Sequence, residues 1–357
     1  MEAAISRFDV LLTACGLRIS PRLLGSRRLC RIVTLSARLV LTAVFLIALT
    51  MLVEYHSLVE VQRILEHASG GLLTLYLAIR IRKIRRLLVS VRSGSYCNLH
   101  SCSQSASAAV VVLQALAQVA LTTAARLSQS PLSQMSSLTA VLALLRDDWV
   151  ITCVLLVDYR LMHPLLYVHV LRLVTLFEES RLKQLTQRIQ EQQVPDYGHL
   201  MRAAKGLDRA RQSFDQLFNL IPFTLFALSF LSIPNTIANL RTQLDLQGIK
   251  MSSHILTHLM TTAVMALLVW TADRSQARIR SGIREVRDAL EEKHASRVQT
   301  LGYQGLVDQL TRYEGSGLTG GGLFSVDRRL VLSFLSAHIT ITVLIIQLES
   351  GSTASVQ

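Results

Sequence analysis

Charged and aromatic side chains are scarce in this sequence. Asp, Glu, Lys and Arg together make up 17% of the 357 residues, and Phe, Trp and Tyr only 6%, whereas half of the chain is hydrophobic. The mean hydropathy is +0.39, which is too apolar for an ordinary soluble protein of this length. The composition therefore excludes a typical soluble globular protein and predicts a chain that crosses a membrane several times.

Cysteine pairs, metal-ligand spacings and catalytic motifs are also lacking. The five cysteines are an odd number and show no metal-binding spacing, so we expect free thiols and no disulfide framework. We recognise no phosphate-binding loop, no nucleophile beside a base and no pair of catalytic carboxylates. The sequence therefore predicts neither an enzyme nor a bound cofactor or metal.

Basic residues are in excess, with 37 Lys and Arg against 24 Asp and Glu and a net charge of +13. Such a charge can indicate nucleic-acid binding, but here the basic residues lie between apolar segments and not on one face of a domain, so we expect none. The apolar segments are long enough to span a bilayer. They predict seven membrane spans, at residues 37–53, 59–79, 106–127, 149–177, 214–240, 251–272 and 330–348.

The positions of the basic residues orient these spans. Most of the 37 Lys and Arg residues fall on the side of the membrane that holds residues 1–36, and the positive-inside rule makes this side cytoplasmic. We predict an all-α membrane protein with seven transmembrane helices, a cytoplasmic N-terminus and an extracellular C-terminus. Its parts are an N-terminal segment at 1–36, six spans at 37–272 with a cytosolic extension at 178–213, a cytosolic anchor or linker at 273–329, the last span at 330–348 and an extracellular tail at 349–357.

Three features between the spans predict local structure. The charged stretches 178–193 and 273–312 have helical patterns, and we interpret them as solvated helices that extend the fourth and sixth spans. Pro222 and Pro234 should bend the fifth span. The glycines between Gly315 and Gly322 predict a flexible link before the last span.

The last span carries a polar stripe. Its polar members follow one another at helical steps of 3, 4 and 7, with Val343 and Leu344 between them, whereas Val331, Phe334 and Leu335 are on the opposite face. One interpretation is close packing of helices through small residues, and the other is a pore lining with an apolar constriction. The polar residues of the stripe are Ser333, Ser336, Thr340 and Gln347.

The sequence around this span resembles the end of the insect gustatory receptors. In that family Thr-Tyr is followed by five hydrophobic residues and Gln-Phe, and residues 340–348 read Thr-Ile-Thr-Val-Leu-Ile-Ile-Gln-Leu. Ile341 replaces the family's Tyr and Leu348 its Phe, and both replacements stay apolar. Residues 322–324, Gly-Leu-Phe, with Asp327, Arg328 and Leu330 are similar to the family's approach to its last helix.

The resemblance implies a ligand-gated, non-selective cation channel. Four identical or different gustatory receptor subunits would surround one pore lined by the last helix, and the cytosolic helices would form the subunit interface. By this resemblance Gln347 forms a ring of amides near the outer mouth of the pore, and Leu344 or Val343 is the apolar constriction beside Leu348. Thr340 either lines the pore or bonds back to the carbonyl of Ser336.

The ligand pocket implied by the family lies among the outer halves of the first six spans. Each polar residue there can either contact a ligand or form a structural hydrogen bond within the bundle. His254 and His258, four residues apart, could also bind a metal, but no third ligand is assignable, so we predict no metal site. The candidates are Gln118, Thr122, Trp149, Thr152, Asn235, Asn239, His254 and His258.

The few aromatic residues favour a bitter-type tastant over a sugar, because sugar pockets use aromatic platforms. The resemblance also implies the plasma membrane of a sensory dendrite, with lipid around the spans. A multi-pass transporter and a non-conducting chemoreceptor subunit that needs partners are the alternative functions. A transporter would be expected to show internal repeats with paired broken helices, and the prolines of the fifth span have no counterpart in the first half.

Overall fold

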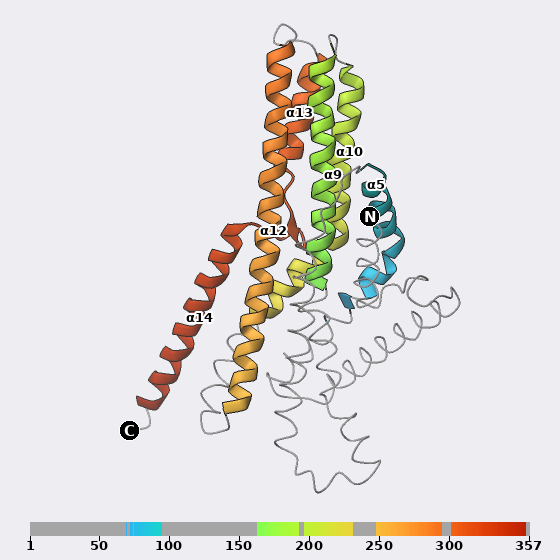
Figure 1. Cartoon of the computed structure of the whole chain (residues 1–357). Coiled ribbons are helices and arrows are strands. Elements are labelled where there is room, and N and C mark those ends of the chain that lie inside the picture. The colour runs from blue at the N-terminus through green and yellow to red at the C-terminus, as the bar shows by residue number, and fades with distance from the viewer. Residues whose placement is uncertain are drawn as a thin grey trace, which may run out of the picture.

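The computed structural model describes residues 69, 72–73, 75–94, 163–192, 196–230, 248–294 and 301–354. Predictions that concern other residues, such as the first and third spans, lie outside this part of the chain. The described residues are helical apart from a short hairpin and its connections (Figure 1). The elements are α5 (Ile81–Gly94), α9 (His163–Glu191), α10 (Tyr197–Phe218), α12 (Gly248–His294), α13 (Leu301–Gly315), β1 (Thr319–Gly320), β2 (Phe324–Ser325) and α14 (Arg328–Ala354).

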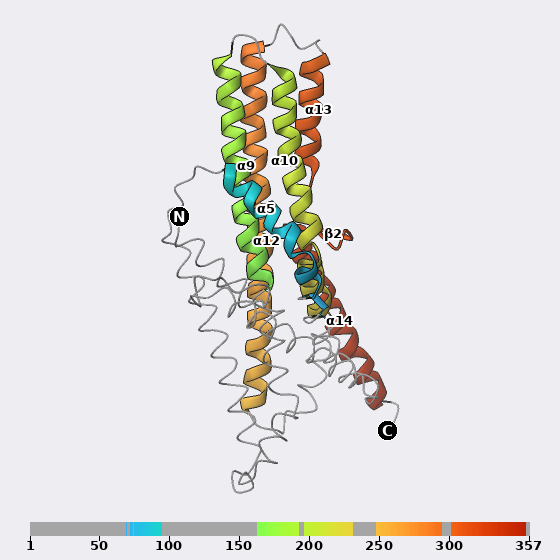
Figure 2. The same cartoon turned by 90° about the vertical axis from the view of Figure 1, so that its right-hand side faces the viewer.

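Helices α9, α10, α12 and α13 run side by side as a bundle (Figures 1 and 2). Its core is apolar, and Leu182, Phe214, Ile283 and Leu310 from the four helices are buried. The predicted helices over the charged stretches are therefore observed where the structure describes them, but they are solvated on one side only. Each of them buries one apolar face against the other helices of the bundle.

The two longest bundle helices continue the predicted fourth and sixth spans without interruption. Helix α9 has 29 residues and α12 has 47, so each joins an apolar segment to a charged one in a single rod. Helix α10 is capped by Asp196, whose carboxylate accepts a hydrogen bond of 3.0 Å from the backbone N–H of His199. This cap satisfies one of the donors that the first helical turn leaves free.

Helix α10 ends at Phe218, and a turn at Asn219 separates it from a second helical stretch over residues 220–230. Pro222 lies one turn further on and has no N–H to donate to the carbonyl of Phe218. The interruption agrees with the bend expected at this proline. The bend expected at Pro234 lies outside the described residues.

Helix α5 packs across α9 and α10. Its buried residues Ile84, Leu87 and Val91 recur at steps of three and four, whereas the basic residues Arg82 and Arg86 are exposed. Just before α5, Tyr76 and Arg80 donate hydrogen bonds of 2.9 and 2.8 Å to the carbonyl of Gln216. These bonds fix the start of α5 to the end of α10.

The glycine-rich segment before α14 is an ordered hairpin, so its interpretation as a flexible link is wrong. Strands β1 and β2 pair antiparallel, with Thr319 opposite Ser325 and Gly320 opposite Phe324. Gly321 and Gly322 have φ angles of 60° and 75°, which glycine adopts at the least cost. A Cβ atom on Gly321 would also lie 3.1 Å from the ring of Phe223. The glycines therefore shape a tight turn against the helix that follows α10.

The predicted last span falls within α14, which begins at Arg328. Among the residues that the structure describes, no helix is both long enough and apolar enough to cross a membrane. The seven-span topology stays a prediction.

Candidate functional site

Helix α14 is fixed at its start by Asp327. The Asp327 carboxylate accepts hydrogen bonds from the backbone N–H groups of Arg329 and Leu330, at 2.9 and 3.2 Å. Ser325 donates to the other carboxylate oxygen over 2.9 Å. An acidic cap also suits the positive end of the helix dipole. The hairpin, the cap and the helix therefore form one continuous unit.

One side of α14 packs on the same chain through aromatic rings. The ring of Phe334 lies 5.4 Å from that of Phe226, nearly perpendicular to it, and 6.4 Å from that of Phe230. Phe226 also meets Phe324 of the hairpin at 5.8 Å. Val331 is half-buried on the same side. The sequence places Val331 and Phe334 opposite the polar stripe, and both contact the body of the protein.

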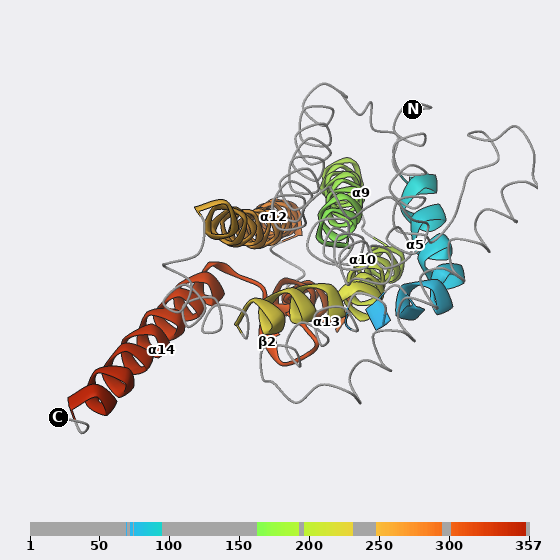
Figure 3. The same cartoon turned by 90° about the horizontal axis from the view of Figure 1, so that it is seen from below.

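The polar stripe of α14 is on the exposed side. Ser333, Ser336, Thr340 and Gln347 are all exposed, and Val343 and Leu344 between them are 45% and 50% exposed. Thr340 donates a hydrogen bond of 2.9 Å to the carbonyl of Ser336, which is the second of the two roles considered for it. Beyond its first turns α14 diverges from the bundle (Figure 3). The stripe is therefore free to face other molecules.

A row of exposed aliphatic side chains flanks the polar stripe. Its members recur at steps of three and four and so occupy one side of the helix. Leu335, which the helical period places opposite the stripe one turn after Val331, is exposed and belongs to this row. Large aliphatic groups at such exposure need an apolar surrounding or partner helices. The row consists of Leu332, Leu335 and Ile339, which are 68%, 46% and 65% exposed.

The hairpin before α14 is docked on the end of α10. The Asp215 carboxylate accepts hydrogen bonds from the backbone N–H and the hydroxyl of Thr319, at 2.7 and 2.8 Å. The N–H of Gly321 donates to the carbonyl of Asn219 over 2.9 Å, at the interruption that follows α10. Leu318 and Val326, on either side of the hairpin, are fully buried. The hairpin thus joins the end of α10 to the start of α14.

The core of the bundle contains a buried ion pair. Arg211 on α10 donates to the carboxylate of Glu178 on α9 over 3.2 Å, and both side chains are almost fully buried. The same guanidinium nitrogen lies 3.2 Å from the Ser275 hydroxyl of α12, which is 2.6 Å from the hydroxyl of Thr175. Burial raises the pKa of the Glu178 carboxyl, and the Arg211 charge opposes this rise. The pair joins three helices in the middle of the bundle.

Two further ion pairs tie α12 to its neighbours. Arg328, the first residue of α14, contacts Asp273 of α12 at 2.6 Å. Arg287 of α12 contacts Glu314 of α13 at 3.0 Å and donates to the Thr311 hydroxyl over 2.9 Å. Helix α12 therefore contacts both the helix before the hairpin and the helix after it.

Neither a protein-family model nor a curated protein matches the sequence. The structure, in contrast, is similar to the insect olfactory receptor OR5 from Machilis hrabei. With the receptor in complex with eugenol the TM-score is 0.63 at 13% sequence identity, over 96% of this chain and 97% of that chain. A second structure of the same receptor gives 0.61 at 12% identity, over the same shares. The chain has the insect olfactory receptor fold. The predicted resemblance to insect chemoreceptors is thereby confirmed for the fold.

Most predicted pocket residues of this insect olfactory receptor fold lie outside the described part of the chain. His254 and His258 fall on the first half of α12, in a stretch whose side chains are not described. In the described part no three His, Cys, Asp or Glu side chains gather as a metal site would require. The residues outside it are Gln118, Thr122, Trp149, Thr152, Asn235 and Asn239.

Sequence reasoning missed the polar groups that link the helices of this insect olfactory receptor fold. Glu178 carried a usable signal, because it continues the buried positions Leu171, Thr175, Leu182 and Leu185 at steps of three and four. A carboxylate in such a row predicts a buried partner. Asp215 gave no comparable signal, because its partner Thr319 is 104 residues away.

Proposed function

We propose that the chain is a chemoreceptor subunit of a ligand-gated, non-selective cation channel in the plasma membrane. Four subunits, identical or of different gustatory receptors, surround one pore, and α14 of each lines it. The observation that supports this proposal most directly is that one side of α14 is packed and the other is exposed. Phe334 and Val331 pack on the chain itself, while the polar stripe and the flanking aliphatic row are exposed. A helix at a fourfold axis needs this division, because its exposed side meets the pore and the neighbouring subunits.

The proposal includes seven spans with a cytoplasmic N-terminus and an extracellular C-terminus. In this arrangement the bundle of α9, α10, α12 and α13 lies in the cytosol, and α14 rises from the hairpin to the outer face. The insect olfactory receptor fold and the positive-inside distribution of Lys and Arg support it.

The gate in this proposal is the apolar constriction within the polar stripe. Leu344 with Val343 closes the pore by excluding water, and Gln347, one turn outward, offers a ring of amides to the passing ion. Leu348, smaller than the aromatic residue of the gustatory receptor motif, lies beside the gate. Thr340 lies one turn inward and already satisfies its hydroxyl within the helix.

The ligand is a small molecule bound among the outer halves of the first six spans. One structural neighbour is in complex with eugenol, a small aromatic compound, and this agrees with an apolar pocket. Together with the low aromatic content it favours a bitter-type tastant over a sugar. The ligand opens the pore only through its preference for the open state.

Whole-cell recording tests the channel and its gate in one experiment. Cells expressing the chain are exposed to a panel of small apolar tastants, beside cells that express Leu344→Ala. We expect ligand-evoked cation current from the chain itself and a ligand-independent leak from Leu344→Ala, because the shortened side chain no longer seals the pore.

Ile339→Ala is the matched control, because Ile339 is an exposed aliphatic residue of the same helix on the flanking row. It should produce no leak. Equal leak from both variants would refute the gate assignment, and silence of every variant at confirmed surface expression would contradict a channel formed by this chain alone.

A further inference from the structure

Helices α9 and α10 enclose a groove between their charged halves that the proposed pore and pocket do not use. It has a volume of about 390 Å³, within the range of sites for small molecules. Leu185 and Leu207 are buried at the floor of the groove. On the α10 side the small residues Ala203 and Gly206 leave the space open. A Cβ atom added at Gly206 would meet nothing within 4 Å. The groove is therefore a space that side chains do not fill.

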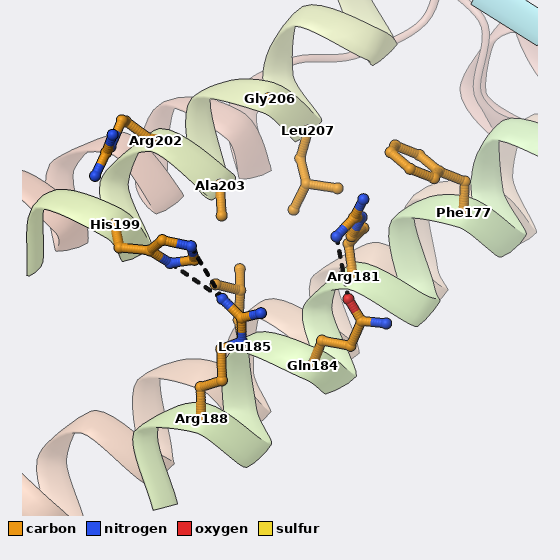
Figure 4. Close-up of a pocket in the computed structure, with 10 residues that line it drawn as sticks. All are labelled: Phe177, Arg181, Gln184, Leu185, Arg188, His199, Arg202, Ala203, Gly206 and Leu207. Atoms are coloured by element: carbon orange, nitrogen blue, oxygen red, sulfur yellow. Dashed lines mark hydrogen bonds between the residues drawn. The ribbon is translucent and has the colours of Figure 1, made fainter. Parts of the chain in front are cut away.

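The rim of this groove is basic. Arg181 and Arg188 from α9, and Arg202 and His199 from α10, surround it (Figure 4). The lining contains no acidic residue. The Arg188 guanidinium is within hydrogen-bonding distance of His199 across the opening, and one of its nitrogens lies 3.2 and 3.1 Å from the two ring nitrogens.

The three guanidiniums lack carboxylate partners among the residues that the structure describes. Arg181 donates to the amide oxygen of Gln184 over 3.2 Å, and Arg202 to the carbonyl of Gly198 over 3.3 Å. The adjacent carboxylates have partners of their own: Asp196 caps α10 through the N–H of His199, Glu191 accepts from Gln187, and Glu179 pairs with Arg278. The positive charge of the groove is thus left for a ligand.

We infer that this groove binds a small anion with several phosphate groups, of the size of an inositol polyphosphate. Each guanidinium can donate two parallel hydrogen bonds to phosphate oxygens. Three guanidiniums at the rim of one groove therefore suit a ligand with several phosphates better than a ligand with one carboxylate. The apolar floor accepts the carbon ring that carries the phosphates. Such a ligand bridges α9 and α10 and holds the tip of the bundle together.

The position of the groove indicates whether the phosphates belong to a soluble compound or to a lipid head group. Its basic residues are toward the tip where α9 ends and α10 begins, the end of the bundle remote from the C-terminal end of α14 (Figure 1). In the topology on which the proposed function rests, this tip is in the cytosol and away from the bilayer. A soluble phosphate compound reaches it, whereas the head group of a membrane lipid does not. The binding site itself does not depend on the channel function.

Calorimetric titration of the full-length, detergent-solubilised protein with inositol hexakisphosphate tests this inference. We expect saturable binding that weakens with added salt, and a dissociation constant at least about tenfold higher for Arg188→Gln, because each lost charge-assisted bond is worth a factor of this order. Arg209→Gln should bind as the unmodified protein does, because Arg209 is an exposed arginine of α10, the other helix of the groove, and lies outside the lining.

A second pair of variants separates charge from folding. Gly206→Glu places a carboxylate in the groove and should abolish binding, whereas Gly206→Gln has the same shape without the charge and should retain most of it. Binding that is equally strong in Arg188→Gln and Gly206→Glu, or absent from a correctly folded protein, would overturn the inference.

A third arm identifies the source of the phosphates. The protein is reconstituted in nanodiscs with and without phosphatidylinositol bisphosphate, and inositol hexakisphosphate binding is measured again. Unchanged binding supports a soluble ligand. Loss of binding only in the lipid-containing discs, dependent on Arg188, keeps the phosphate site but assigns it to a lipid head group. Channel current is not used in any arm, so a failure here is distinct from a failure of the proposed function.

Discussion

Asp215 accepts two hydrogen bonds from Thr319, one from the backbone N–H at 2.7 Å and one from the hydroxyl at 2.8 Å. Asp215 belongs to the last turn of α10, and Thr319 begins the hairpin that leads into α14. The two residues are 104 positions apart in the sequence. Their contact makes the hairpin a stiff joint between the bundle and the proposed pore helix.

The joint predicts a measurable effect of Thr319→Val. The variant keeps the backbone bond but leaves one oxygen of a half-buried carboxylate without its partner, which costs about 1–3 kcal/mol. We expect a lower unfolding temperature of the solubilised protein and, in cells, a smaller ligand-evoked current at unchanged surface expression. Thr186→Val is the control, because the Thr186 hydroxyl bonds only to the carbonyl of Leu182 in its own helix among the contacts described. Equal losses in both variants would contradict the joint.

The buried pair of Glu178 and Arg211 predicts a larger loss of stability. Arg211→Met leaves the Glu178 carboxylate buried without its cation, and such a change costs about 3–5 kcal/mol. The exposed pair of Arg278 and Glu179, at 3.3 Å, is the matched comparison, and Arg278→Met should cost at most about 1 kcal/mol. Thermal unfolding of the two variants in the same detergent measures the difference. A shift for Arg211→Met no larger than that for Arg278→Met would contradict the stabilising role of the buried pair.

The same carboxyl predicts a dependence of stability on pH. Burial raises the pKa of Glu178 above its usual value of 4.5, so the folded protein holds this proton more tightly than the unfolded chain does. The stabilisation from this group is present below pH 4.5 and is lost as the pH rises through the raised pKa. Glu178→Gln removes the group, so the difference in unfolding temperature between variant and unmodified protein should change across this window. A constant difference would contradict the raised pKa.

Local patterns in the sequence were enough to predict much of α14 and of the bundle. The steps of 3, 4 and 7 between polar residues separated the exposed side of α14 from the side of Phe334, because both sides follow from one helical period. The period does not show how much of that side is covered, because Val331 and Phe334 pack on the chain whereas Leu335 is exposed. Phe226 and Phe230 contact Phe334, and so they determine which part of the α14 surface is covered by the same chain.

Contacts between distant segments were beyond the sequence. Composition indicates flexibility around Gly321, yet the residue is held by the carbonyl of Asn219, about a hundred positions earlier. Likewise, a charged stretch indicates a solvated helix, and only knowledge of an oppositely charged residue elsewhere in the chain would show that one of its charges is buried. Arg211 makes Glu178 a core residue, and no pattern within one helix reveals that partner.

Gln347 gives the most direct prediction about ion passage. If four Gln347 side chains surround the outer mouth, Gln347→Glu turns a ring of amides into a ring of carboxylates, which attracts cations and above all divalent ones. We expect the permeability to Ca²⁺ relative to Na⁺ to rise severalfold, measured as a shift of the reversal potential in cells with confirmed surface expression. Gln347→Asn keeps the amide and should shift it little. The same charge placed on the flanking row, in Leu332→Glu, should leave the ratio unchanged, because that row faces neighbouring helices or lipid. A change of selectivity in Leu332→Glu and none in Gln347→Glu would mean that the other side of α14 faces the ion path.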